Sequence, residues 1–449
     1  MTLHRGRATV VLFTRDLRVH DHPALAEAVA VSERVVPLFV LDDALLASDY
    51  PRPNRVQFLL ESLADLDESL RALGGGLVVR RGDAVGEAIR LAQGVGAQAI
   101  FTSADVSAFA QRRARRLARG CAAHGLEHRE FPGLTLVAPG AIRPAGGDHF
   151  RVFTPYWNRW RAAPRRRLAA PPGRLVLPPG LAVGTLPARA DLVGGATSPH
   201  LAPGGEARAR GRLAAWCREE VQRYAERRDA PAAEGTSRLS PYLHFGCVSP
   251  LEVVSRCPAG EAGAAFVRQL CWRDFHHQVT AAFPAITHRD YRPRGRRWPD
   301  DAELLEAWKA GRTGYPIVDA GMRQLAAEGW MHNRARLVTA SFLVKHLGLD
   351  WRLGARHFLD LLVDGDIANN SGNWQWVAGT GNDTRPQRTF NPIRQALRVD
   401  PDGSFVRRWV PELAPVAGPR VHTPWALEPA ERARLGYCEP LGTPARGRA

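Results

Sequence analysis

The sequence has few cysteines, and their arrangement argues against two common roles. Six occur in 449 residues, with no CxxC pair and no Cys/His spacing that would bind zinc. The pattern therefore favours neither a disulfide framework nor a structural zinc, and His276, His277 and His332 also lack metal-ligand companions at a convincing spacing. We predict no metal site and expect reduced, mostly buried thiols at Cys121, Cys217, Cys247, Cys257, Cys271 and Cys438.

Long apolar runs are also missing. No stretch approaches the roughly 20 apolar residues that a membrane-spanning helix needs. The N-terminal letters MTLHRGRATVVLF contain neither the apolar core nor the cleavage site of a signal peptide. We therefore expect a cytoplasmic protein without a membrane partner, and we expect it to be a monomer.

Acidic residues are fewer than basic ones. The chain carries 61 Lys and Arg against 45 Asp and Glu, a formal net charge of +16. Such a surplus attracts polyanions, and nucleic acid is the partner that it favours. The arginine-rich composition of a GC-rich genome would produce the same surplus without any ligand. Charge alone leaves both explanations open.

The length and the local patterns predict two main domains. A chain of 449 residues is too long for one ordinary core. In residues 1–130, β-branched runs at 10–13, 35–41, 77–80 and 99–102 alternate with helical patterns such as 55–73 and 110–124. This alternation is typical of βαβ units, so we predict a doubly wound α/β domain with a parallel sheet. No GxGxxG follows its first strand, so the usual dinucleotide site is not indicated.

The rest of the chain reads differently. Residues 131–206 are rich in Pro, Gly, Ala and Arg with little periodicity, which indicates a long interdomain linker. From residue 207 to residue 449 the spacing is helical, and this part is predicted to be an all-α domain.

One segment in the helical part has an unusual composition. Residues 364–376 read DGDIANNSGNWQW, with two aspartates, two adjacent asparagines and two tryptophans. Carboxylates and carboxamides organise a polar heterocycle through hydrogen bonds, and indoles stack on bases and pass single electrons. The segment favours redox or light chemistry.

Three further segments are each ambiguous. GTSRLS at 235–240 suits a phosphate group or a plain helix cap. FVRQLCWRDFHH at 266–277 puts Gln269, Trp272, Arg273 and His276 on one helix face, which suits a nucleobase or a solvated helix about equally. In WMHNRARLVTASFLVK at 330–345, Asn333 suits a base edge and Arg334 a phosphate, although a solvated helix start is the default.

Together these segments resemble one family, the DNA photolyase and cryptochrome flavoproteins, and most closely the bacterial class I cyclobutane pyrimidine dimer photolyases. The resemblance extends over essentially the whole chain, and the order and spacing of its motifs are highly specific. The carrying segments are TRDLRVHDHPAL at 14–25, RVFTPYWNRW at 151–160, EGTSRLSPYLHFG at 234–246, residues 266–277, residues 313–352, residues 364–376, and FNPIRQALRVDPDGSFVRRWVPEL at 390–413.

The resemblance implies that the helical domain binds FAD, and that residues 1–130 form an antenna-chromophore domain. Tyr224 and 236–240 match the diphosphate and ribityl contacts, Arg336 and Asp364 an ion pair beside the flavin, and Asn370 the residue facing its reactive nitrogen. Phe266 stands where many relatives have Trp. The implied FAD-binding set is Tyr224, Thr236, Ser237, Arg238, Leu239, Ser240, Phe266, Gln269, Arg273, Asn333, Arg336, Asp364, Asp366 and Asn370.

The resemblance also implies a light-driven reaction. In the family, excited reduced FAD gives an electron to a pyrimidine dimer, which splits and returns it. Trp374, Trp351 and Trp298 match the family's electron-transfer chain, with Trp374 nearest the flavin and Trp298 nearest water. The implied function is repair of cyclobutane pyrimidine dimers in UV-damaged DNA by a deoxyribodipyrimidine photo-lyase.

The implied DNA contacts include two departures from the family pattern. Trp272 and Trp376 match the walls that stack on a flipped dimer, and Arg228, Asn333 and Arg334 match flanking contacts; photolyases are themselves a standard example of base flipping. Gln269 replaces a glutamate, and an amide lacks the proton that a carboxyl shares. Leu337 replaces a methionine and loses its sulfur. Gln also occurs there in (6-4) photolyases, but those carry a histidine at the position of Asn333.

The resemblance also implies an antenna chromophore, a folate or a deazaflavin, and an empty site stays open as a third alternative. The segment ADVSAFAQRR at 104–113 departs from the acidic pattern that holds folate in some relatives, with Gln111 near the position of a glutamate. Two other functions stay open. A cryptochrome-type photoreceptor would use the same flavin without repair, although the chain has only about forty residues after VPEL. The second alternative is a basic helical protein that merely binds DNA. Such a protein would lack flavin absorption and would be colourless.

Overall fold

The computed structural model describes residues 8–442, and these fall into two compact units. Unit 1 takes the residues up to Ala196 together with Ala202–Val221 and Ser237–Ala285. Unit 2 takes Thr197–Leu201, Gln222–Thr236 and the residues from Ile286 onward. The domain boundaries predicted at residues 130 and 206 remain predictions.

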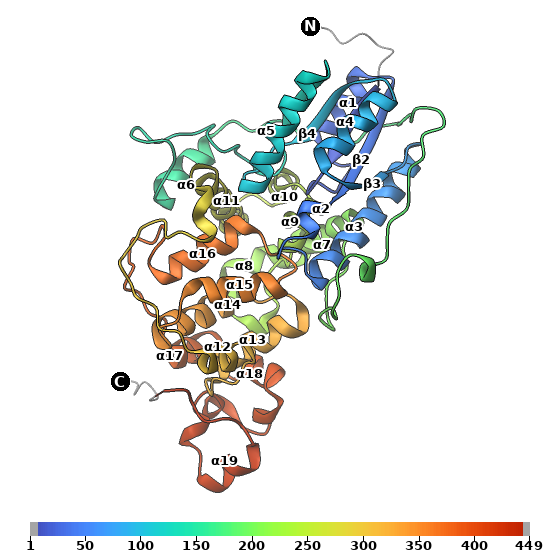
Figure 1. Cartoon of the computed structure of the whole chain (residues 1–449). Helices are drawn as coiled ribbons and strands as arrows, with labels where there is room; N and C mark the ends of the chain where they lie inside the picture. The colour runs from blue at the N-terminus through green and yellow to red at the C-terminus, as the bar shows by residue number, and fades with distance from the viewer. Residues whose placement is uncertain (1–7, 443–449) are drawn as a thin grey trace. The chain divides into compact units, whose positions relative to one another are not determined.

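Unit 1 is built around a parallel sheet of five strands. The strands are β1 (Ala8–Phe13), β2 (Arg34–Asp42), β3 (Val78–Gly82), β4 (Ala97–Ser103) and β5 (Glu127–Phe131), in the order β3-β2-β1-β4-β5 (Figure 1). The order reverses between β1 and β4, as in doubly wound sheets. The predicted α/β class is confirmed. The four predicted strands match β1 to β4, whereas the polar sequence EHREF of β5 was not predicted.

Helices flank this sheet, and short polar side chains cap α2, α4 and α5. They are α1 (Pro23–Val31), α2 (Asp43–Leu46), α3 (Pro53–Ala72), α4 (Ala84–Gly94) and α5 (Ala108–Ala123). Asp83 caps α4 by accepting from the Gly86 N–H, and Ser107 caps α5 by accepting from the Ala110 N–H. Residues of α4 and α5 share one core with the strands. The helical patterns at 55–73 and 110–124 are confirmed as α3 and α5.

More helices complete unit 1 beyond the sheet. They are α6 (Phe153–Ala162), α7 (Glu206–Ala215), α9 (Ser240–Phe245), α10 (Pro250–Arg256) and α11 (Glu261–Ala282). Helix α6 lies inside the segment that composition marks as a linker. Unit 1 therefore combines the α/β sheet with a helical layer that includes α11, the longest helix in this unit.

Asp274 fastens α11 within unit 1. Its Oδ2 accepts from the Leu136 N–H (2.9 Å), the Val137 N–H (3.1 Å) and the Trp160 indole N–H (2.9 Å). Asp274 is 1% exposed. Burial raises the pKa of its carboxyl to about 6, although the Arg273 charge and these hydrogen bonds act in the opposite direction.

Replacing Asp274 with asparagine should change how stability depends on pH. Because the folded pKa, about 6, lies above the ordinary value of 3.8, the contribution of Asp274 is complete below 3.8 and is lost as pH rises through about 6. The loss amounts to about 3 kcal/mol. An asparagine at this position has no such step, and its carbonyl accepts from the same donors. Urea unfolding well below and well above pH 6 should show the variant gaining on the wild type at high pH. Parallel profiles would contradict this.

All regular elements in the described residues of unit 2 are helices. Its helices are α8 (Tyr224–Arg227), α12 (Ala302–Lys309), α13 (Pro316–Glu328), α14 (Asn333–Ser341), α15 (Trp351–Leu361), α16 (Ile367–Ala378), α17 (Pro392–Val399), α18 (Ser404–Trp409) and α19 (Pro429–Leu435) (Figure 1). One core joins the helices from α12 onward and contains Trp308, Trp351, Phe358 and Trp374. The predicted helical part is confirmed here. Over residues 8–442 no helix is long and apolar enough to cross a bilayer.

The six cysteines are free thiols. Cys121, Cys247 and Cys271 are buried, and the other three are half-buried. Burial raises the pKa of Cys121 to about 11 and that of Cys247 to about 12. Thiols held this far from ionisation are poor nucleophiles, so they act as packing residues.

Candidate functional site

An ion pair in unit 2 joins α14 to Asp364, which lies three residues before the first residue of α16. The Arg336 Nη2 donates to both oxygens of Asp364, at 3.1 and 2.9 Å, and its Nε donates to the Met331 carbonyl at 2.8 Å. The Asp364 side chain is only 3% exposed and that of Arg336 is 25% exposed. The pair that the family resemblance implied is therefore present and mostly buried.

The first turn of α16 carries further buried polar groups. Asp366 is the N-cap, and its Oδ1 accepts from the backbone N–H (2.9 Å) and side-chain amide (2.7 Å) of Asn369. The Asn370 Nδ2 donates to the Ala355 carbonyl at 3.0 Å, which turns the Asn370 Oδ1 to the opposite side of the amide. Asp364, Asp366 and Asn370 are all below 10% exposed. A carboxylate and an amide oxygen are thus fixed close together in sequence and space.

Three tryptophans follow one another along α15 and its flanks. A Cβ added to Gly354 would lie 2.2 Å from the Trp374 ring, so Trp374 packs directly on the backbone of α15 one turn from Trp351. At the other end, a Cβ on Gly348 would meet Pro299, the neighbour of Trp298, at 3.8 Å. Trp374 and Trp351 are 2% and 0% exposed, whereas Trp298 is half-buried. Burial thus decreases from Trp351 towards Trp298.

The predicted DNA-contacting residues of unit 2 are partly engaged with neighbours. Asn333, Arg334 and Leu337 lie on the first turns of α14, and Arg334 is paired with Asp229. Burial opposes ionisation of Asp229, but the Arg334 hydrogen bond prevails and lowers its pKa. The Arg228 guanidinium lies 5.9 Å from the centre of the Tyr224 ring.

Trp376 is covered by a residue that the sequence did not single out. The Arg388 guanidinium lies 5.2 Å from the Trp376 ring centre, within cation–π range. The Phe390 ring centre lies at 6.3 Å. An aromatic wall flanked by a guanidinium is suited to stacking on a base beside a phosphate.

The loop before α9 belongs to unit 1. The Arg212 Nε donates to the Ser237 carbonyl at 2.7 Å, and the Leu239 N–H donates to the Ser237 hydroxyl at 3.3 Å. Arg238 has a φ of +50°, a left-handed conformation that is uncommon for a residue other than glycine. Ser240 begins α9, and Thr236 is assigned to unit 2. The loop is bent and is held by a hydrogen bond from Arg212 of α7 and by one within the loop.

Four of the predicted site residues, at positions 266, 269, 272 and 273, lie on α11 in unit 1. The Trp272 ring stacks on Phe153 with centres 3.6 Å apart and planes at 2°, so one face of this indole is covered. Phe266 is buried against Trp216, with ring centres 5.3 Å apart. The Arg273 guanidinium donates to the carbonyls of Leu134 and Leu243, while Gln269 is half-buried.

The predicted site residues are therefore divided between the two units. Unit 2 brings together Arg336, Asp364, Asp366 and Asn370, and separately the tryptophans around α15. Unit 1 holds the loop 237–240 and the α11 residues. Within residues 8–442, no group of three or more His, Cys, Asp or Glu is placed to hold a metal.

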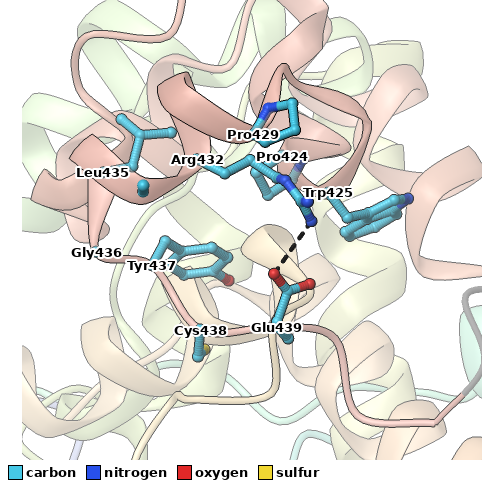
Figure 2. Close-up of a pocket in the computed structure, with 10 residues that line it drawn as sticks. Pro424, Trp425, Pro429, Arg432, Leu435, Gly436, Tyr437, Cys438 and Glu439 are labelled. Carbon is cyan, nitrogen blue, oxygen red and sulfur yellow. Dashed lines mark hydrogen bonds and ion pairs between the residues drawn. The ribbon is translucent and has the colours of Figure 1, made fainter.

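A cavity of about 430 Å³ lies elsewhere in unit 2. Figure 2 shows that the Arg432 guanidinium and the Glu439 carboxylate face each other. They form an ion pair at 3.1 Å. The cavity contains none of the predicted site residues. Its lining is Pro424, Trp425, Pro429, Arg432, Ala433, Leu435, Gly436, Tyr437, Cys438 and Glu439.

Comparison with known proteins decides the family. Residues 9–173 match the profile described as DNA photolyase, and residues 266–443 match the FAD binding domain of DNA photolyase. The chain is 52% identical to the deoxyribodipyrimidine photo-lyase of Streptomyces griseus over 98% of its own length and 97% of that protein. It belongs to the DNA photolyase family.

Solved structures agree with this photolyase assignment. The crystal structure of a bacterial class III photolyase from Agrobacterium tumefaciens matches with a TM-score of 0.90 and 33% identity, covering 97% of this chain and 94% of that one. A cryptochrome from Synechocystis also matches, with a TM-score of 0.90, 30% identity and coverage of 98% and 97%. The fold is thus shared by a photolyase and a cryptochrome.

Proposed function

We propose that this photolyase is a deoxyribodipyrimidine photo-lyase, a lyase that uses light to split cyclobutane pyrimidine dimers in UV-damaged DNA. One observation carries the proposal: a relative of that name is 52% identical over 98% of the chain. The net charge of +16 suits a DNA substrate. We propose further that the protein acts as a monomer in the cytoplasm.

The cofactor is FAD, as the matching FAD-binding profile supports. When bound, it supplies absorption of blue light and transfer of a single electron. The buried groups of unit 2 suit its polar ring: Asp364 is neutralised by Arg336, and the Asn370 amide is fixed by Ala355. The FAD-binding residues that we propose from the resemblance are Ser237–Ser240, Phe266, Gln269 and Arg273 in unit 1, and Tyr224, Thr236, Asn333, Arg336, Asp364, Asp366 and Asn370 in unit 2.

Trp374, Trp351 and Trp298 form the proposed electron relay. The order in which they pack along α15, and the greater exposure of Trp298, support a path from a buried donor to solvent. The relay restores the reduced state of the cofactor and takes no part in splitting the dimer.

For DNA, we propose that Trp272 and Trp376 stack on the flipped dimer. Phe153 fixes the Trp272 plane from one side, so the other face is the one that contacts the lesion. Arg228, Arg334 and Asn333 contact the flanking strand, and Leu337 fills apolar space beside them. Such backbone contacts make binding strongly dependent on salt.

The proposed function is tested by direct repair. Reduced protein is mixed with an oligonucleotide containing a thymine dimer and illuminated with blue light, and intact thymines are quantified. Recovery of thymines is expected. If FAD is bound and the oligonucleotide binds but no thymine is recovered, the photoreceptor alternative replaces repair. A colourless purified protein, without flavin absorption, would support DNA binding as the only function.

Replacing Gln269 with glutamate should raise the repair yield. A carboxyl group stabilises the dimer radical anion by sharing a proton, whereas an amide only donates an N–H. The repair yield should rise a few-fold. One charge-assisted hydrogen bond would favour splitting of the dimer, but the yield also depends on the steps that compete with splitting. Quantum yields measured on chemically reduced wild type and Gln269→Glu at equal FAD content provide the comparison. An unchanged or lower yield would count against this role for position 269.

The antenna chromophore is proposed to be a folate or a deazaflavin in unit 1. In doubly wound sheets ligands bind where the strand order reverses, which here lies after β1 and β4. Arg15 follows β1 and Asp105 follows β4, and they form an ion pair at 3.4 Å. The absorption spectrum of the chromophore released from purified protein distinguishes the two pigments.

A further inference from the structure

A short loop of unit 2, residues 286–291, is fastened to α16 by one buried amide. The Gln375 Nε2 donates to the carbonyls of Ile286 (2.7 Å) and Arg289 (2.9 Å), and its Oε1 accepts from the Tyr291 N–H (2.8 Å). Gln375 is 0% exposed. Because Gln375 follows Trp374 directly, the loop is held in register with the helix that carries that indole.

This loop places a carboxylate on the indole of Trp351. The Trp351 Nε1–H donates to the Asp290 Oδ1 at 3.0 Å. Arg352 supports the same geometry, since its Nη2 donates to the Asp290 Oδ1 at 2.7 Å and its Nε to the His288 carbonyl at 2.9 Å. The Arg352 guanidinium also lies 4.9 Å from the centre of the Trp351 ring.

A second indole beside Trp374 has a different environment. The Trp308 ring meets the Trp374 ring edge to face, with centres 6.1 Å apart, and Trp308 is 0% exposed. Its Nε1–H donates to the backbone carbonyl of Thr339 at 3.0 Å. Trp308 and Trp351 are both 0% exposed. Trp308 contacts the Trp374 ring, and Trp351 lies one turn of α15 from Gly354, on which Trp374 packs. The acceptor on Trp308 is neutral and the acceptor on Trp351 is an anion.

The two acceptors differ in how well they stabilise a positive indole. An indole that has lost one electron is a cation, and a carboxylate at hydrogen-bond distance stabilises a cation more strongly than a carbonyl dipole does. In a buried environment this difference is large because little water screens it. The Arg352 guanidinium acts in the opposite sense on the same ring, with a weaker effect because it is farther away and partly exposed.

We propose that Asp290 is a positioning residue that directs the relay, so that Trp351 rather than Trp308 gives its electron to oxidised Trp374. This rests on the proposed function. Trp374 is oxidised first, by the light-excited oxidised cofactor. Trp351 then transfers one electron to Trp374, which becomes neutral, and the Trp351 cation keeps its N–H in the hydrogen bond to Asp290. Trp298 returns one electron to Trp351, and a thiol in the buffer reduces Trp298.

The first experiment compares photoreduction in FAD-loaded protein. Oxidised wild type, Asp290→Asn and Asp290→Glu are illuminated with a thiol present, and the loss of the oxidised flavin absorption is followed. Asp290→Asn leaves a neutral acceptor like the one on Trp308 and should slow photoreduction about tenfold, the effect of losing a charge-assisted hydrogen bond. Asp290→Glu should recover much of the rate, which a purely structural role of this loop would not predict.

A variant that should accelerate photoreduction and a spectroscopic measurement complete the test. Arg352→Gln removes the opposing charge and should accelerate photoreduction about threefold. In FAD-free protein, the NMR signal of the Trp351 indole N–H is assigned by its loss in Trp351→Phe. This signal should move upfield in Asp290→Asn.

The outcomes separate this inference from the function on which it rests. Wild type that binds no FAD or repairs no dimer would overturn both. If FAD-loaded Asp290→Asn repairs dimers after chemical reduction and also photoreduces at the wild-type rate, only the role of Asp290 is overturned. Should Asp290→Asn fail to fold, an unchanged or lower rate in Arg352→Gln overturns the inference, and a higher rate supports it.

Discussion

Replacing Trp374 with phenylalanine should slow the light-driven reduction of bound FAD by about a hundredfold or more. Phenylalanine fills most of the space beside Gly354 and Phe358 but is far harder to oxidise than an indole, so the first electron donor is lost. Trp374 is 2% exposed, and its truncation leaves a small cavity that lowers stability by about 1–3 kcal/mol. The rate is measured on FAD-loaded protein, with thermal unfolding recorded in parallel.

Trp308→Phe is the matched control for that experiment. Trp308 is as deeply buried, contacts Trp374 and belongs to the same core, so its replacement carries a similar packing cost. Because its indole lies outside the proposed relay, photoreduction should stay within about twofold of the wild type. Equal slowing by both substitutions would mean that packing, and not electron donation, limits the rate.

Much of the fold could be predicted from local sequence patterns. The β-branched runs of β1, β2 and β4 are buried along most of their length, and such strands stand out from their surroundings. Strand β5 was not predicted because its residues 127–130 are polar and lie exposed or half-buried at the edge of the sheet. Its place is set by pairing with β4, a tertiary contact that no short window of sequence contains.

The candidate site divides in the same way. Arg336, Asp364 and Asn370 lie in motifs whose order identified the family, so sequence was enough to select them. Phe153, Arg388 and Asp290 were not selected, although each contacts a predicted tryptophan. Asp290 reaches Trp351 across 61 positions and from a loop with no motif, so only the folded chain reveals the contact. Residues that tune a neighbour through one hydrogen bond leave little trace in local composition.

Replacing Arg336 with alanine should destabilise unit 2 and release FAD. The Asp364 carboxylate, 3% exposed, would keep its burial and lose the guanidinium that binds both of its oxygens. Leaving a buried charge without its partner costs about 3 kcal/mol after allowance for the partial exposure of Arg336. Urea unfolding gives the stability, and the fluorescence of flavin released at equilibrium gives the affinity, which should fall about a hundredfold.

Two further variants decide whether the buried charge is the cause. Adding Asp364→Asn to Arg336→Ala removes the uncompensated carboxylate and should recover at least about half of the lost stability, because removing both partners of a buried pair costs less than removing one. Arg432→Ala breaks the pair with Glu439, whose side chains are 36% and 72% exposed, and should cost less than about 1 kcal/mol. If the double variant were no more stable than Arg336→Ala, the guanidinium would be stabilising unit 2 through Met331 and its packing, and Asp364 would carry its charge at little cost.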